Sequence, residues 1–113
     1  MFDIISLDFN KNINKKKGRM DKINVSGIEF DAYSIPTPNA SLLVISAKSG
    51  MLACGYLKLE TAEKLGDALA IVTGVSCYDD MLEKSVVAVS KSAEAKGVEV
   101  GMSGRDALIK MNS

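Results

Sequence analysis

Residues 42–57 read LLVISAKSGMLACGYL, and this stretch decides the fold. Two nearly continuous apolar runs, LLVISA and MLACGYL, lie on either side of Ser49-Gly50. Strands that are covered on both faces read as unbroken apolar runs, and a short Ser-Gly pair between two such runs is typical of a hairpin loop. The stretch therefore predicts a central hairpin with strands at 42–48 and 51–57.

A second hairpin is predicted just upstream. Residues 21–25 and 28–34 alternate apolar with polar side chains, and the phase of this alternation changes at Ser26-Gly27. An alternation with period two indicates strands that bury one face, and the change of phase favours a two-residue loop over one long strand. The segment PTPN at 36–39 then predicts a loop between the two hairpins.

A helix over 60–73 is predicted to follow. Glu60 and Glu63 lie in its first turn, where the helix dipole favours acidic side chains, and Gly74 stands at its carboxyl end. Small residues recur along one side of this helix, and we expect them to pack on the sheet or, alternatively, to form a contact between subunits. They are Ala62, Gly66 and Ala70.

Shorter elements complete the prediction. The run SVVAVS at 85–90 reads as a buried strand, and 105–111 reads as a final helix. Helical turns are expected up to Lys84 and at 93–96, and 98–100 could add a marginal strand.

The order of these elements predicts an α+β fold. Strands come first and helices later, with one βαβ passage, which indicates a two-layer α/β sandwich with helices on one face of the sheet. The sheet is expected to be mostly antiparallel, built from two successive hairpins plus one later strand. A chain of 113 residues suits a single core, and we assign it to residues 20–113.

Residues 1–19 are expected to be a basic appendage, because the run FNKNINKKKGR at 9–19 is rich in Asn and Lys and has too few apolar residues to offset its ordering entropy. The segment either lies upstream of the working start codon or forms a basic arm that docks on a partner. Residues 1–22 carry six basic and three acidic side chains, whereas 23–113 carry eight and eleven. An acidic body is a poor match for phosphate backbones, so no nucleic-acid partner is expected.

The absent residue types narrow the function classes. The chain has no histidine and two cysteines, which excludes histidine acid–base catalysis, a Ser-His-Asp triad and a Cys/His zinc site within one chain. We expect no metal and no cofactor. No stretch reaches the roughly 18 apolar residues of a membrane span, and two cysteines are too few for a disulfide framework. The prediction is therefore a cytoplasmic protein without a membrane partner.

Four segments resemble one known family. GMLACGYL at 50–57, TAEKLGDALAIVTGV at 61–75, DDML at 79–82 and GVEVGMSGRDAL at 97–108 are similar to the YunC-like family, a small archaeal and bacterial domain of unknown function. The resemblance spans nearly all of residues 21–113 and leaves 1–19 outside. It implies a two-layer α/β sandwich and supplies no activity or catalytic residues.

Cys54 is the first candidate site residue. On a strand its side chain points to the same face as Leu52 and Tyr56, opposite to Ala53 and Gly55. A free cysteine is most often a small buried hydrophobe. The alternative is a thiolate nucleophile, which needs a cationic neighbour such as Arg105 or Lys48, because no histidine exists to activate it.

The second candidate is the turn at Ser103, Gly104 and Arg105. Ser103 followed three residues later by Asp106 is a helix-capping pattern, and capping alone explains both residues. Alternatively, a glycine beside a helix N-terminus, with an arginine in the first turn, binds a small anion.

These observations favour a binding function. We expect a domain that binds a small ligand, an anion in particular, or another protein, and that self-associates as a homo-oligomer. The alternatives are an enzyme that uses Cys54 as its nucleophile and a structural subunit of a larger assembly.

Overall fold

A computed structural model describes residues 18–113, so the expected appendage lies outside the described residues except for its last two positions. Within this part of the chain the elements follow one another as β1 (Arg19–Val25), β2 (Ile28–Pro36), β3 (Ser41–Ser46), β4 (Met51–Ala53), α2 (Leu59–Leu65), β5 (Leu69–Ile71), α3 (Tyr78–Glu83), β6 (Ala88–Val89), α4 (Lys91–Glu94) and α5 (Gly104–Lys110).

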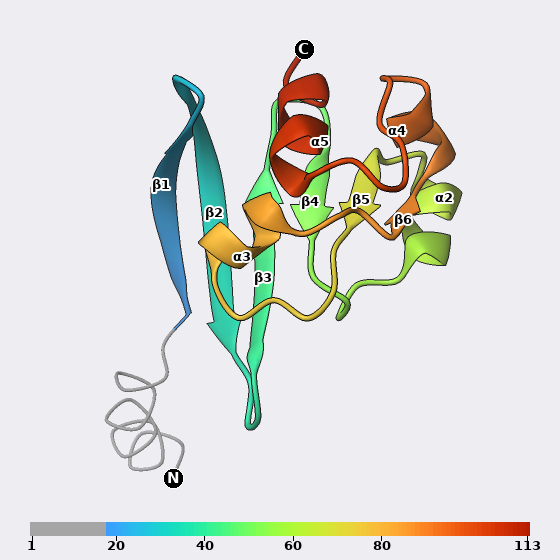
Figure 1. Cartoon of the computed structure of the whole chain (residues 1–113). Helices are drawn as coiled ribbons and strands as arrows, with labels where there is room; N and C mark the ends of the chain where they lie inside the picture. Colours follow the sequence, from blue (N-terminus) through green and yellow to red (C-terminus); the bar gives the residue numbers. More distant parts are fainter. Residues whose placement is uncertain (1–17) are drawn as a thin grey trace, which may run out of the picture.

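The six strands form one sheet in chain order, from β1 to β6 (Figure 1). Neighbouring strands are antiparallel except for β4 and β5, which are parallel. Both predicted hairpins are confirmed. Ser26 and Gly27 have φ values of 54° and 84°, and two positive φ angles are what a type I′ hairpin turn requires. The mostly antiparallel α+β fold is therefore confirmed.

The predicted helix over 60–73 is wrong in its second half. Helix α2 ends at Leu65, where Gly66 adopts a left-handed conformation with φ of 77° and caps the last carbonyls. Leu69 to Ile71 then form β5, between β4 and β6. Ala70 therefore lies on a strand, so the expected stripe of small residues does not form one helix face.

Three shorter predictions also need correction. The strand expected at 51–57 ends at Ala53, because the chain turns away after β4. The strand expected at 85–90 shrinks to β6, and no strand forms at 98–100. The final helix is confirmed, one residue earlier than expected.

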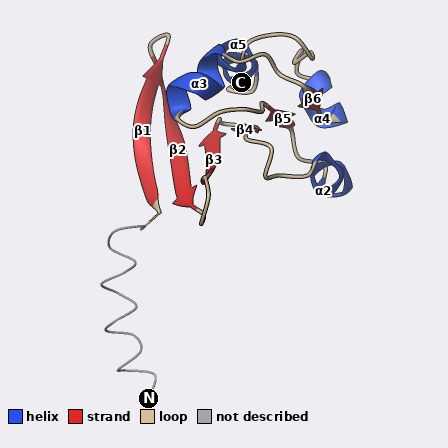
Figure 2. Ribbon diagram, turned by 60° about the horizontal axis from the view of Figure 1, so that its bottom comes forward, coloured by secondary structure: helices blue, strands red, loops and turns tan. Residues whose placement is uncertain are grey.

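The sheet buries both faces at its β4–β6 end. Leu52 and Ala70 point toward α3 and α5, in the main core. Ala53 and Leu69 point to the opposite face, where they pack with Ala62 of α2. Figure 2 shows α3 and α5 on one side of the sheet and α2 on the other. Helix α2 is thus the exception to the expectation that the helices share one face.

The helices are short. Among residues 18–113, no helix has the length and apolar character needed to cross a membrane.

Helix α5 begins in close contact with α3. The N–H of Gly104 donates to the carbonyl of Lys84 at 2.9 Å. A Cβ atom at position 104 would collide with the carbonyl oxygen of Met81 and would lie 2.9 Å from Cδ2 of Leu52. Only glycine lets the two helices approach this closely.

Replacing Gly104 with alanine should therefore destabilise the protein by about 3 kcal/mol, the upper end for overpacking, because the carbonyl it meets belongs to the backbone. Urea denaturation measures the change. The control is Arg105→Ala at the next position, which removes an exposed ion pair and should cost about 1 kcal/mol or less. Equal effects of the two substitutions would contradict the close approach of α5 to α3.

Candidate functional site

A hollow of about 310 Å³ lies at the carboxyl ends of β4 and β5. In open α/β sheets, ligands bind outside the carboxyl ends of the strands, because the loops that follow the strands meet there. The loop after β4 and the loop after β5 form most of the wall, and the start of β3 completes it. The lining residues are Ala40, Ser41, Cys54, Gly55, Tyr56, Thr73, Gly74 and Val75.

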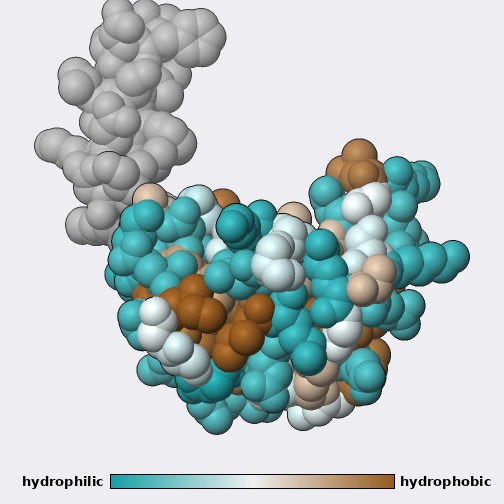
Figure 3. Space-filling model, turned by 90° about the horizontal axis from the view of Figure 1, so that it is seen from above, coloured by the Kyte–Doolittle hydropathy of each residue, from teal (hydrophilic) through white to brown (hydrophobic). Residues whose placement is uncertain are grey.

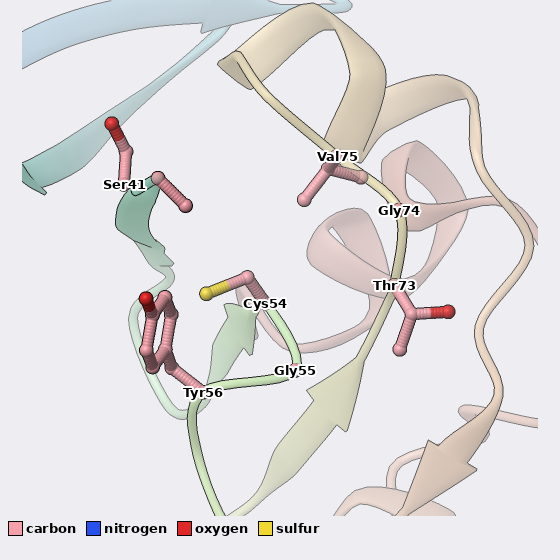
Figure 4. Close-up of a pocket in the computed structure, with 8 residues that line it drawn as sticks. Ser41, Cys54, Gly55, Tyr56, Thr73, Gly74 and Val75 are labelled. Carbon is pink, nitrogen blue, oxygen red and sulfur yellow. The ribbon is translucent and has the colours of Figure 1, made fainter. Parts of the chain in front are cut away.

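The sulfur of Cys54 points into this hollow, with Tyr56 and Ser41 on one side and Val75 on the other (Figure 4). The residue is 4% exposed. Its Sγ accepts a hydrogen bond from the Leu43 N–H at 3.3 Å, and its own N–H donates to the Leu43 carbonyl at 3.0 Å. Cys54 therefore continues the pairing of β3 with β4 and is held firmly in the wall.

The cationic neighbours considered for Cys54 lie elsewhere. Lys48 belongs to the turn at the opposite end of β4, where its N–H donates to Oδ1 of Asn112 at 3.2 Å. Arg105 pairs with Glu83 at 3.0 Å. Among the described residues that line the hollow, none is charged.

The Ser103–Arg105 turn makes the contacts of a helix start. Oγ of Ser103 accepts a hydrogen bond from the Asp106 N–H at 3.1 Å, which is the predicted cap. The Gly104 N–H and the Arg105 guanidinium have partners as well, in Lys84 and Glu83. The structure does not bring this turn together with Cys54, because none of its three residues lines the hollow.

Sequence reasoning missed the contribution of Thr73, Gly74 and Val75. These residues were expected at the end of a helix, and they reach the site because β5 pairs in parallel with β4. Gly66 is the residue in the sequence that could have revealed this, because it ends α2 early and leaves the following residues free to form β5.

The loop that carries these residues is anchored by Ser76. Its N–H and its hydroxyl both donate to Oδ2 of Asp80, each at 3.0 Å. These two hydrogen bonds favour the charged carboxylate and lower the pKa of Asp80. The loop after β5 is thereby tied to the first turn of α3.

A second hollow, of about 290 Å³, lies between α2 and the sheet. Tyr56 lines both hollows. We call the first the Cys54 hollow and the second the α2 groove. The groove is lined by Met51, Tyr56, Leu57, Lys58, Thr61, Ala62, Leu65, Asp67 and Leu69.

Metal ligands do not gather at either hollow. Across residues 18–113, no group of three or more His, Cys, Asp or Glu side chains lies close enough to hold a metal ion.

Comparison with known proteins places the chain in a family. The DUF1805 family, a domain of unknown function, matches residues 53–111. The uncharacterized protein YunC of Bacillus subtilis (strain 168) is 31% identical over 93 residues, which cover 79% of this chain and 92% of YunC. The chain belongs to the DUF1805 family. The resemblance seen in the sequence is thus confirmed, and the DUF1805 match includes both loops of the Cys54 hollow.

A solved structure shows a similar fold in another protein. The crystal structure of a protein of unknown function, TA1206 from Thermoplasma acidophilum, superposes with a TM-score of 0.78 at 35% identity. The match covers 83% of this chain and 92% of that one.

The two thiols should differ in reactivity. Cys77 is exposed and Cys54 is buried. With iodoacetamide at pH 7, a Cys54→Ser protein should be alkylated at the rate of a model thiol. A Cys77→Ser protein should react more slowly by roughly tenfold or more, because Cys54 is 4% exposed and its sulfur is held by the Leu43 N–H. Mass spectrometry follows both rates. Alkylation of Cys54 faster than a model thiol would identify it as an activated nucleophile.

Proposed function

We propose that this DUF1805 domain binds a small, uncharged molecule in the Cys54 hollow. One observation carries the proposal: two loops that follow parallel strands border an open hollow of about 310 Å³, and a thiol points into it. That volume lies at the lower end of the roughly 300–1,000 Å³ of ligand pockets.

The chemistry of the wall favours an uncharged ligand. A charge taken out of water needs an opposite charge or several hydrogen bonds to offset the loss of hydration. The described lining residues offer hydroxyl groups, a thiol and backbone groups, but no charged side chain. A polar molecule without charge matches this set better than the anion expected from the Ser103–Arg105 turn.

Binding is favoured over catalysis by the same wall. A cysteine nucleophile is activated by a neighbouring base or cation. The sulfur of Cys54 instead meets a backbone N–H and uncharged side chains. A cytoplasmic location remains part of the proposal, and the two free cysteines support it.

Self-association is the second candidate, and the open part of the sheet supports it. Met20 pairs with Tyr33 and Tyr33 pairs with Val44, which places these side chains in one row across β1, β2 and β3. Met20, Tyr33 and Ile35 are 52%, 40% and 53% exposed. Exposed apolar side chains that gather on one face mark an interaction surface.

The ligand site predicts a local effect in solution. A screen of small uncharged molecules against the full chain, followed by NMR, should shift amide signals of residues 40–41, 54–56 and 73–75. Val75→Phe should fill the hollow and weaken binding about tenfold or more, a loss of about 1.4 kcal/mol. Val100→Phe, at an exposed position outside the hollow, is the control. Equal affinity of the two variants would overturn the proposed site.

Self-association predicts a second effect. Sedimentation velocity of the full chain should give a mass above that of one chain. Tyr33→Lys should reduce the mass toward 12.1 kDa, because it places a charge in the apolar row. Val87→Lys, at an exposed position beside β6, should not change it. A wild-type protein with the mass of a single chain would rule this candidate out.

A further inference from the structure

Two neighbouring rows of side chains cross β1 and β2 on the bare part of the sheet. The apolar row pairs Met20 with Tyr33, which are 52% and 40% exposed. The next row along the strands pairs Lys22 with Asp31, and Nζ of Lys22 lies 2.8 Å from Oδ1 of Asp31. We call this pair the charged row. An apolar contact surface thus lies directly beside one positive and one negative charge.

Both rows lie on the side of the sheet that carries α2. Tyr33 pairs with Val44, and Val44 pairs with Ala53, so these three side chains share one face. Ala53 packs with Ala62 of α2, which identifies that face. Asp31 stands two residues before Tyr33 on β2 and therefore points the same way. Helices α3 and α5 lie on the other side and leave both rows open (Figure 2).

Helix α2 forms a step beside the two rows. In the view from above, the lobe that carries α2 stands out from the surface, and the molecule is hollowed beside it (Figure 3). One sheet stacks on another at about 10 Å, which is close to the diameter of a helix, about 10–12 Å. The height of the step therefore matches the thickness of one more sheet.

We propose that two copies of this chain pack these faces together about a two-fold axis that runs along the strands, between β1 and β2. This inference rests on the proposed self-association and names the arrangement of the two copies. The axis lays β1 of one copy on β2 of its partner. Met20 then meets the partner's Tyr33, and Lys22 meets the partner's Asp31. One symmetry operation thus sets apolar on apolar and charge on opposite charge, each twice.

The other two-fold arrangements of the same face fit less well. An axis along β2 itself sets Asp31 against the partner's Asp31, and like charges that face each other across an interface oppose association. An axis across the strands keeps β1 over β1 and therefore lays α2 on the partner's α2. The step holds one layer, so two helices stacked there would keep the sheets apart. The charged row and α2 together select the axis between β1 and β2.

Reversing one charge at a time tests this arrangement. Lys22→Asp leaves two aspartates in the charged row, and Asp31→Lys leaves two lysines. Each variant of the full chain, studied alone, sets like charges against its partner, so its self-association should weaken by roughly tenfold or more. An equimolar mixture of the two sets aspartates against lysines and should restore the mass of two chains. Sedimentation velocity over a series of concentrations measures both effects.

Further variants serve as controls. One chain that carries both substitutions keeps opposite charges in the row, so it should self-associate as the wild type does. Arg105→Glu and Glu83→Lys reverse the charges of an exposed ion pair, 3.0 Å long, between α5 and α3. This pair lies on the other side of the sheet, and each reversal should leave self-association unchanged (Figure 2). Circular dichroism checks that every variant is folded.

The outcomes separate this inference from the proposed self-association. If the wild type self-associates and Lys22→Asp or Asp31→Lys does so equally well, the charged row lies outside the interface and the arrangement is wrong. Tyr33→Lys then still decides the self-association. A mixture that keeps the mass of one chain also overturns the arrangement, because the two rows then do not face each other. A wild type with the mass of a single chain overturns both.

Discussion

The parallel pairing of β4 with β5 is the constraint on which the rest of the structure depends. The chain leaves β4 after Ala53 and returns to β5 at Leu69, and α2 lies within that short crossover. Parallel strands need a crossover of a dozen or more residues, so this connection is near the minimum length. The pairing directs both strands the same way and therefore brings the loops after them to one end of the sheet. The Cys54 hollow is a consequence of that geometry.

The strands β4 and β5 have three residues each, and strands this short need hydrogen bonds beyond those between the strands themselves. Ser90 supplies it: its side chain is completely buried, accepts a hydrogen bond from the Leu69 N–H at 2.9 Å and donates to the Asp67 carbonyl at 2.8 Å. Buried polar groups are costly unless they are paired, and this hydroxyl is paired in both directions. Ser90 thereby fixes where β5 begins and links it to the start of α4. The position of Thr73 to Val75 in the site follows from where β5 begins.

The features of the fold that depend on local sequence pattern were predicted correctly. Alternation at 21–34 and the phase change at Ser26-Gly27 identified the first hairpin, because side-chain period and turn chemistry are local properties. The side chains of Leu52 and Cys54 lie on the same face of the sheet, as their spacing predicted. The helix over 60–73 failed because positions 62, 65, 69 and 72 fit helical spacing, while 68–72 fit a buried strand equally well. Which one forms depends on β4 and β6, and no local pattern contains that information.

The residues of the candidate site can be divided in the same way, into those that a local sequence pattern predicts and those that depend on long-range strand pairing. Cys54 was found because it stands within a strand that the sequence identified, whereas Gly74 and Val75 enter only through the long-range parallel pairing. The same crossover explains why Tyr56 borders two hollows: the chain leaves the sheet at the end of β4 and leads to α2, on the face opposite to α5. A residue at that turn lies on the boundary between the two faces. An uncharged hollow on one side of Tyr56 and an apolar groove on the other are therefore both results of one short crossover. The binding that we propose for the Cys54 hollow would draw its affinity from buried apolar area and from hydrogen bonds to the hydroxyl and backbone groups of the wall.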